Sequence, residues 1–307
     1  MTDVYKNRFY DEASPALSIL IPFFKDDASA LVSALATQKT SEPIEIIVVD
    51  DGTGDPVLTS RLQSLTTELP AAICLITSAK NGGRAAARNR LQQAARSDWL
   101  LFLDADMRPV SQNFLHTYLS EIERNRADII FGGFTVESQS EDKSGALHRA
   151  LSAVSDCLPL KERQAAGPQY VASSNLCLRK SVITENPFDN GFVGWGWEDS
   201  EWAARVSKSY TLIHIDNPAL HLGLENEDTL LKRFQLSGPN YARFTDKHPE
   251  LAKTLTLYRL SKRLRKVPGQ KFGRPILRRL VKSNAPMRAR LIALKLWRAS
   301  WYAEALK

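Results

Sequence analysis

Two aspartates separated by one residue, Asp104 and Asp106, follow directly on the apolar run at residues 99–103. Carboxylates at this spacing can hold Mg²⁺ or Mn²⁺, and such a cation can neutralise the charge on a departing diphosphate. The same tripeptide also forms turns and helix caps at the ends of strands. Because this copy follows a predicted buried strand, the sequence favours metal binding while the turn stays an alternative.

Two further segments offer groups that suit a nucleotide. Asp51 lies in a run of Asp and Gly that closes the apolar stretch 44–49, and its carboxylate could accept a hydrogen bond from a uracil N–H or a ribose hydroxyl. The alternative is turn chemistry, which uses the same residues. The turn at residues 81–83 leads into a predicted helix with Arg84 and Arg88, and a helix N-terminus with arginines suits a phosphate. A helix start with solvated arginines is the alternative.

The segment Gly191-Phe192-Val193-Gly194-Trp195-Gly196-Trp197-Glu198-Asp199 combines three kinds of residue that suit a sugar. Glycines allow close backbone approach to a ligand, and indole rings offer flat apolar faces. Glu198 and Asp199 start a predicted helix, where acids are stabilised by the helix dipole, so capping is the alternative interpretation. Capping does not explain Trp195 and Trp197 in a glycine-rich loop, so we predict a functional role.

His221 follows the stretch Pro218-Ala219-Leu220. A single histidine is more often a structural residue than a ligand. It becomes a candidate third ligand only if Asp104 and Asp106 already hold a metal, which a neutral imidazole would suit.

The elements that must position these residues alternate between strands and helices. The sequence predicts strands near residues 17–22, 44–49, 72–77 and 99–103, with helices near 27–37, 56–68 and 84–95 between them. This order predicts an open, mostly parallel α/β sheet, in which ligands bind beyond the carboxyl ends of the strands. An α+β region follows at residues 129–178, with a polar loop at 137–144. A helix from Ser200 and a strand near 210–215 come next.

Taken in order, these motifs resemble those of the family 2 glycosyltransferases with the GT-A fold. The resemblance rests on Pro22-Phe23-Phe24, Val48 to Thr53, Gly82 to Asn89, Leu103 to Asp106 and Gly194 to Asp199, and it spans residues 15–225. The last of these motifs resembles the acceptor motif of chondroitin-polymerase-type and β-galactosyltransferase-type enzymes.

The resemblance implies a role for each matched position. Pro22, Phe24, Asp51, Arg84, Arg88 and Asp104 would bind the nucleotide sugar, and Asp104, Asp106 and His221 would hold Mn²⁺ or Mg²⁺. Asp199 would be the catalytic base, and Glu198, Trp195 and Trp197 would bind the acceptor. Two positions depart from the pattern, because Phe24 replaces a tyrosine and Trp197 replaces a glycine. The lost hydroxyl and the narrower pocket would alter the contacts with donor or acceptor.

Charge divides the chain into two parts. From Leu257 onward there are fifteen Lys or Arg and one acid, Glu304, which gives +14, whereas the preceding 256 residues hold 26 bases and 33 acids, which gives −7. We expect a GT-A domain at residues 1–235 and a basic helical C-terminal extension at 236–307. The extension contains amphipathic helices that could contact an anionic membrane or pack on the catalytic domain. Nucleic-acid binding is not expected, because the part with the motifs is acidic.

The sequence thus predicts an inverting, metal-dependent hexosyltransferase of surface-polysaccharide biosynthesis, with a nucleotide sugar (UDP-linked) as donor and a glycan or lipid-linked acceptor. A catalytically inactive nucleotide-sugar-binding subunit is the alternative. Three cysteines with no metal spacing, no leader-like N-terminus and no long apolar run predict a cytoplasmic protein, peripheral to the membrane if the extension binds it.

Overall fold

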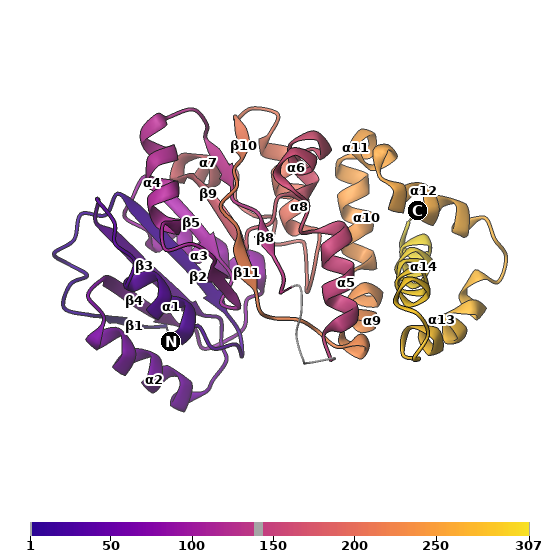
Figure 1. The fold of residues 1–307 in the computed structure, drawn as a ribbon, viewed down its shortest axis with the longest axis horizontal. Helices are drawn as coiled ribbons and strands as arrows, with labels where there is room; N and C mark the ends of the chain where they lie inside the picture. The colour runs from indigo at the N-terminus through magenta and orange to yellow at the C-terminus, as the bar shows by residue number, and fades with distance from the viewer. Residues whose placement is uncertain (1, 138–143, 307) are drawn as a thin grey trace.

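The computed structural model describes residues 2–137 and 144–306. A large sheet lies at one end of the molecule and a group of helices at the other (Figure 1). The strands of the large sheet, in spatial order, are β1 (Asp3–Lys6), β4 (Ala72–Thr77), β3 (Ile44–Asp50), β2 (Leu17–Phe23), β5 (Trp99–Leu103), β9 (Asn175–Arg179), β7 (Ile129–Phe131) and β10 (Leu212–His214).

The centre of this sheet is parallel, as the alternation of strands and helices predicts. β2 pairs in parallel with β3 and β5, and β3 pairs in parallel with β4, whereas β1 and β9 run antiparallel to their neighbours. The strands β2, β3 and β5 are buried on both faces, and apart from Ser18, Glu45 and Asp50 their residues are apolar without alternation. The predicted α/β fold class is confirmed.

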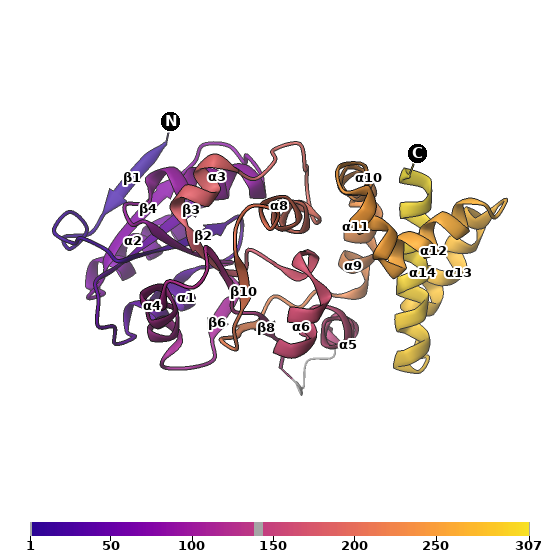
Figure 2. The same ribbon diagram turned by 90° about the horizontal axis from the view of Figure 1, so that it is seen from above.

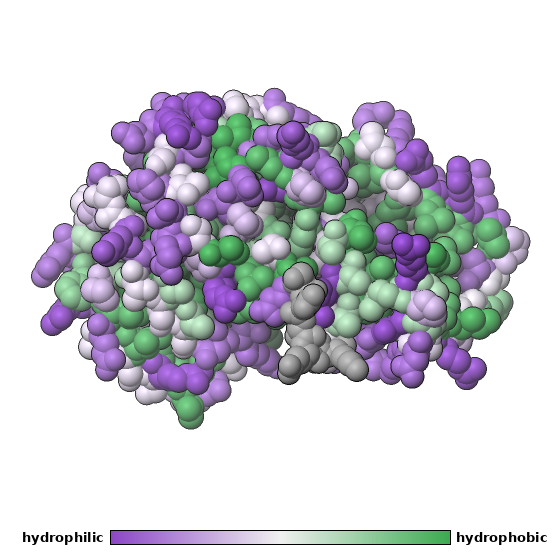
Figure 3. Space-filling view, viewed as in Figure 1, coloured by the Kyte–Doolittle hydropathy of each residue, from purple (hydrophilic) through white to green (hydrophobic). Residues whose placement is uncertain are grey.

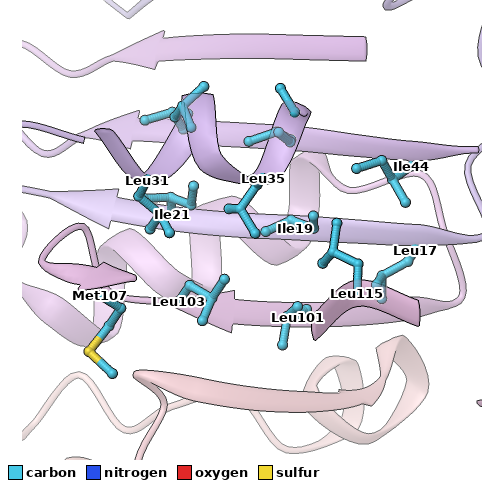
Figure 4. Close-up of a cluster of buried hydrophobic side chains, with 14 of the residues drawn as sticks. Leu17, Ile19, Ile21, Leu31, Leu35, Ile44, Leu101, Leu103, Met107 and Leu115 are labelled. Atoms are coloured by element: carbon cyan, nitrogen blue, oxygen red, sulfur yellow. The ribbon is translucent and has the colours of Figure 1, made fainter. Parts of the chain in front are cut away.

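Helices cover both faces of the sheet (Figure 2). One face packs against α1 (Ser29–Ala36), α2 (Pro56–Glu68) and α4 (Phe114–Arg124), and the other against α3 (Arg84–Ala94), α7 (Lys180–Glu185) and α8 (Glu198–Val206). Neighbouring strand residues point to opposite faces, so Ile19 and Ile21 contact Leu31 and Leu35 on the first face (Figure 4). Leu20 faces the second core.

A second, three-stranded sheet lies where the predicted site begins. It contains β6 (Met107–Pro109), β11 (Ala219–His221) and β8 (Phe134–Thr135), and β11 pairs antiparallel with β6 and parallel with β8. The sequence predicted a strand near residues 210–215 and none at 219–221, whereas residues 219–221 form the strand β11. The two helices α5 (Ala146–Ser155) and α6 (Leu160–Ala166) follow β8, and the predicted polar loop at 137–144 lies mainly outside the described residues.

The C-terminal part is helical, as predicted. It contains α9 (Glu227–Leu236), α10 (Gly238–Lys247), α11 (Pro249–Thr254), α12 (Thr256–Arg265), the 3₁₀ turn η2 (Gln270–Gly273), α13 (Arg274–Val281) and α14 (Met287–Ala305). The long helix α14 packs against α9, α10, α12 and α13, and also against α5. The boundary expected between residues 235 and 236 stays a prediction. Of the helices at residues 2–137 and 144–306, none combines the length and apolar character needed to cross a bilayer.

Tyr302 connects α14 to the rest of the molecule. Its buried hydroxyl accepts hydrogen bonds from Trp197 Nε1 (3.0 Å) and Arg298 Nε (3.1 Å), and it lies 2.7 Å from Ser237 Oγ. Because its two lone pairs are used, this hydroxyl donates its proton to Ser237. A single phenol thus joins the glycine-rich loop, the start of α10 and α14.

We expect Tyr302→Phe to lower the free energy of unfolding by about 1–3 kcal/mol, because it leaves Trp197 Nε1 and Arg298 Nε without their partner. Urea unfolding of the full chain measures this change. Tyr258→Phe is the matched control, because the Tyr258 hydroxyl makes no hydrogen bond with the described part of the chain. A loss of equal size in both variants would contradict the role of the Tyr302 hydroxyl.

Candidate active site

A cavity of about 990 Å³ opens at the carboxyl ends of β2, β3 and β5. Its walls come from these strand ends, from the turn before α3, from the loop at residues 190–197, and from helices on the C-terminal side. Every residue that the sequence predicted for the site lines this cavity: Pro22, Phe24, Asp51, Arg84, Arg88, Asp104, Asp106, Trp195, Trp197, Glu198, Asp199 and His221. The fold therefore gathers residues up to two hundred positions apart, while their individual roles remain predictions.

Asp106 and His221 are brought together by the register of the small sheet. His221 pairs with Met107 across the antiparallel strands β6 and β11, so it lies beside the residue that precedes Met107. His221 Nε2 is 3.1 Å from Asp106 Oδ2. Gly223 leaves room for this carboxylate, because a Cβ atom at Gly223 would lie 2.0 Å from Asp106 Oδ2.

The His221 ring is polarised from one side and unpaired on the other. Burial lowers its pKa, but the hydrogen bond and charge of Asp106 outweigh burial, so the net pKa is raised. The buried Nδ1 atom has no hydrogen-bond partner among the described residues. The His148 ring packs edge-on at 5.8 Å, and burial and His221 lower the pKa of His148 to about 4. His148 Nδ1 accepts a hydrogen bond from the Glu225 N–H (2.8 Å), so this ring is neutral.

Asp104 accepts hydrogen bonds from the arginines of α3 and also interacts electrostatically with His221. Arg84 Nη2 donates to one Asp104 oxygen (2.9 Å), and Arg88 Nη2 donates to the other (2.8 Å). Burial alone would raise the pKa of Asp104, but Arg88 and Arg84 lower it below its usual value. Within residues 2–137 and 144–306, no group of three or more potential ligands is arranged to hold a metal ion.

Arg88 is the buried centre of the cavity's charges. Its side chain is only 1% exposed, and its guanidinium lies between Asp104 and the pair Glu198–Asp199. Nη1 is 3.8 Å from Glu198 Oε1 and 4.0 Å from Asp199 Oδ1. Neither Nε nor Nη1 has a hydrogen-bond partner in the described structure. This cation therefore links the acids at the end of β5 with those at the start of α8.

The two acids at the start of α8 lie in different surroundings. Glu198 is 6% exposed, and Arg84 Nε is 3.3 Å from its carboxylate; burial and the neighbouring Asp199 raise its pKa. Asp199 is 22% exposed and accepts hydrogen bonds from Ser173 Oγ (2.8 Å) and the Ser173 N–H (3.2 Å). Asp199 is thus the more accessible carboxylate, and Ser173 fixes its orientation.

The two tryptophans line the cavity but also pack against the C-terminal helices. The Trp195 ring contacts Phe234 of α9 at 5.7 Å. Trp197 has a left-handed backbone (φ 77°), and its ring stacks on Tyr241 (4.6 Å) and Phe244 (4.9 Å) of α10. The sequence alone indicates no structural role for these two rings, whereas in the structure they pack against helices α9 and α10. Their contact with an acceptor stays a prediction.

Asp51 is held by the turn that precedes α3. Its carboxylate accepts hydrogen bonds from the N–H groups of Gly82 (3.0 Å) and Gly83 (2.8 Å), so it closes this turn. Its side chain is buried yet borders the cavity, together with Pro22 and the exposed ring of Phe24. This end of the cavity therefore has a flat apolar wall and a fixed carboxylate.

Several lining residues were not predicted from the sequence: Asp26, His148, Asp156, Arg233 and Arg298. Burial and the nearby Asp106 and Asp104 raise the pKa of Asp26. Arg298 lies on α14, with its guanidinium 5.3 Å from the Trp197 ring centre, so the extension forms part of the cavity wall. No local motif marks these residues.

Comparisons with known proteins identify a family and a fold for this chain. The family described as glycosyl transferase family 2 matches residues 18–182. Hyaluronan synthase of Pasteurella multocida is 27% identical over 222 residues, which cover 62% of this chain and 22% of that protein. The chain therefore spans less than a quarter of that relative's length.

Two solved structures share the fold. A mannosyltransferase from Pyrobaculum calidifontis, in complex with GDP-Man and Mn²⁺, has a TM-score of 0.59 and 14% identity, over 99% of this chain and 90% of that one. TarS residues 1–349 of S. aureus, in complex with UDP-GlcNAc, has a TM-score of 0.52 and 14% identity, over 94% and 90% of the two chains. At these identities the likeness establishes the fold.

We expect Arg88→Met to lower the free energy of unfolding by about 3–5 kcal/mol, because it leaves three carboxylates without their buried cation. The folded variant should hold Glu198 protonated more readily, so the loss should shrink as the pH falls. Denaturant unfolding at several pH values, without ligand, measures both effects.

Arg84→Met is the matched control, because Arg84 lies one turn earlier on α3, also binds Asp104, and is 39% exposed. Its loss should be about 1 kcal/mol or less. Similar losses for the two variants would show that burial of Arg88 does not set its importance.

Proposed function

The chain belongs to glycosyl transferase family 2 and is therefore a glycosyltransferase; from this premise we propose an inverting, metal-dependent enzyme that uses a UDP-sugar. The observation that carries the proposal is that the Asp106–His221 pair and the accessible Asp199 border one cavity. The Asp106–His221 pair would supply ligands for a metal that neutralises the diphosphate, and Asp199 would supply the base.

The residues present fit a divalent cation. His221 Nε2 and Asp106 Oδ2 are 3.1 Å apart, close to the roughly 3 Å between adjacent ligands of an octahedral ion with bonds of about 2.1 Å. Eight acids and four arginines line the cavity, so its lining carries a net negative formal charge even when Arg84 and Arg88 are counted. We propose that Asp106 and His221 hold Mn²⁺ or Mg²⁺, and that Asp104 contacts either this ion or the ribose of the donor.

The proposed reaction needs one bond to form and one to break. An acceptor hydroxyl oxygen attacks the anomeric carbon while the bond from that carbon to the diphosphate breaks, which inverts the configuration. Asp199, oriented by Ser173, takes the proton from the hydroxyl. When bound, the metal would neutralise the charge on the leaving diphosphate, and Arg84 and Arg88 add fixed positive charge there.

The two ends of the cavity divide the substrates. The base and ribose would lie against Pro22, Phe24 and Asp51, and the complex of TarS with UDP-GlcNAc is consistent with a UDP-linked donor on this fold. The other end has Trp195, Trp197 and Glu198, which we propose bind a glycan or lipid-linked acceptor of surface-polysaccharide biosynthesis. Arg298 borders this end and would add a donor for acceptor hydroxyls.

The proposed setting is the cytoplasm, with peripheral contact to the membrane through the basic extension. Cys74, Cys157 and Cys177 are free, which is consistent with a reducing compartment. Cys74 and Cys177 are buried, whereas Cys157 is only partly so.

We expect Asp106→Asn to weaken Mn²⁺ binding and to lower the rate of donor hydrolysis by about a hundredfold or more, because charge stabilisation of the leaving group is lost. Binding of Mn²⁺ is followed by electron paramagnetic resonance, and hydrolysis is screened with UDP- and GDP-sugars. Asp246→Asn, an exposed site on α10, is the control. Hydrolysis that persists in chelator would remove the metal from the proposal.

Asp199→Asn should lower the rate of transfer by about a hundredfold to ten-thousandfold, because the acceptor proton then has no base. Affinity for UDP should change little, because the nucleotide end of the cavity is untouched. Calorimetry measures the affinity, and product formation with the best donor measures the rate. Full activity in this variant would remove Asp199 as base, and donor binding without turnover in the unmodified protein would favour an inactive subunit.

A further inference from the structure

The corner between α12 and α13 exposes large apolar side chains. Phe272 is 77% exposed, Ile276 is 72% exposed and Val267 is 50% exposed. Gly273 and Arg274 both have right-handed helical backbone, so η2 continues into α13. Phe272 and Ile276 are therefore four residues apart on a helical turn and share a face.

Unpaired cations surround these side chains. Arg265, Lys266, Lys271 and Arg279 are exposed, and none of them takes part in an ion pair within residues 2–137 and 144–306. Arg279 follows Ile276 by three residues, which places it on the same face. We call these four cations, together with Val267, Phe272 and Ile276, the basic corner.

Other cations of the extension are used differently. Arg274 pairs with Glu304 (2.6 Å), Lys282 pairs with Asp228 (2.7 Å), and Arg290 pairs with Glu227. The last two of these pairs tie α13 and α14 to α9. Since Glu304 is the only acid after Leu257, the corner has no acid of its own to balance its charge. The positive charge there is left for a partner.

We propose that the basic corner docks on the surface of an anionic lipid bilayer. The rings and branched chains of Phe272, Ile276 and Val267 would enter the boundary between headgroups and acyl chains, and the cations would lie at the lipid phosphates. Both parts of the corner are needed for such a partner, because apolar side chains gain little from a soluble polyanion. A second copy of this chain fits less well, because a two-fold contact would bring the same cations together.

The surface agrees with this assignment. At the end of the molecule where α12, α13 and α14 lie, hydrophobic residues are interspersed with strongly hydrophilic ones in the space-filling view (Figure 3). The same helices form the end farthest from the large sheet (Figure 1), so the corner is free to meet an extended surface.

The position of α12 relates the corner to the cavity. Leu255, Thr256 and Leu257, at the start of α12, line the cavity, and the corner begins at the other end of this helix. Ten helical residues span about 15 Å. Docking would therefore hold the acceptor end of the cavity close to the bilayer, which suits an acceptor anchored in lipid; this last step rests on the proposed function.

Co-sedimentation of the full chain with phosphatidylcholine vesicles, with and without phosphatidylglycerol, tests the proposal. The protein should bind only the anionic vesicles. The double variant Phe272→Ser, Ile276→Ser should bind about tenfold or more weakly, because it removes the inserted side chains. Val57→Ser is the matched control, because Val57 is 75% exposed on α2 of the catalytic part, and it should bind as the unmodified protein does.

Charge is tested separately. The variant Lys266→Glu, Lys271→Glu, Arg279→Glu should bind on the order of a hundredfold more weakly, at about fivefold for each cation removed. The control Lys39→Glu, Lys161→Glu, Lys208→Glu changes the net charge equally at exposed positions elsewhere and should retain binding. Equal losses in both triple variants would reduce the effect to net charge and overturn the assignment to the corner.

Two further outcomes would also overturn the proposal. One is that the unmodified protein fails to bind anionic vesicles. The other is that sedimentation velocity shows the unmodified protein to be a dimer, which the double variant Phe272→Ser, Ile276→Ser converts to a monomer. Donor hydrolysis in solution, without vesicles, should be unchanged in all corner variants. If the unmodified protein shows no donor hydrolysis, this result counts against the proposed function and leaves the vesicle result intact. The two failures are therefore distinguishable.

Discussion

The charge of Arg88 is the constraint on which the site depends. A guanidinium that is almost completely buried is unstable without anions around it, and this one has Asp104 on one side and Glu198 and Asp199 on the other. These acids come from the end of β5 and the start of α8, and Arg88 comes from α3. The cation therefore fixes how three elements of the sheet face meet. Its positive charge also offsets the repulsion between Asp104 and the pair Glu198–Asp199, which come from distant motifs.

This constraint sets different properties on the two sides of Arg88. Asp104 receives a full hydrogen bond from each arginine and stays ionised, whereas Glu198 is only approached, and its pKa rises. Asp199 is left with a hydroxyl and an amide of residue Ser173 and with access to solvent. The fixed cation thus lies between an ionised carboxylate at the end of β5 and a more accessible one at the start of α8.

The sequence was informative where local pattern decides structure. The predicted strands at 72–77 and 99–103 and the helix at 56–68 agree with β4, β5 and α2, because buried apolar runs and an N-terminal proline are local signals. The convergence of strand ends placed the acids of the cavity on one edge. The pairing of His221 with Met107, and hence its contact with Asp106, depends on the register of two short strands far apart in sequence. No local pattern indicates that register. Likewise, no local pattern marks Arg298 of α14 as a residue of the cavity wall.

The glycine-rich loop has a structural role that its sequence alone does not reveal. Trp197 packs against Tyr241 of α10 and donates a hydrogen bond to Tyr302 of α14. Trp197 has a left-handed backbone, and its ring packs against Tyr241 and Phe244, whereas the carboxylates of Glu198 and Asp199 lie near Arg88. The helices after the catalytic motifs therefore do more than follow them. Tyr302 binds Trp197, and Trp197 immediately precedes Glu198, so α14 contacts the segment that carries two acids of the cavity.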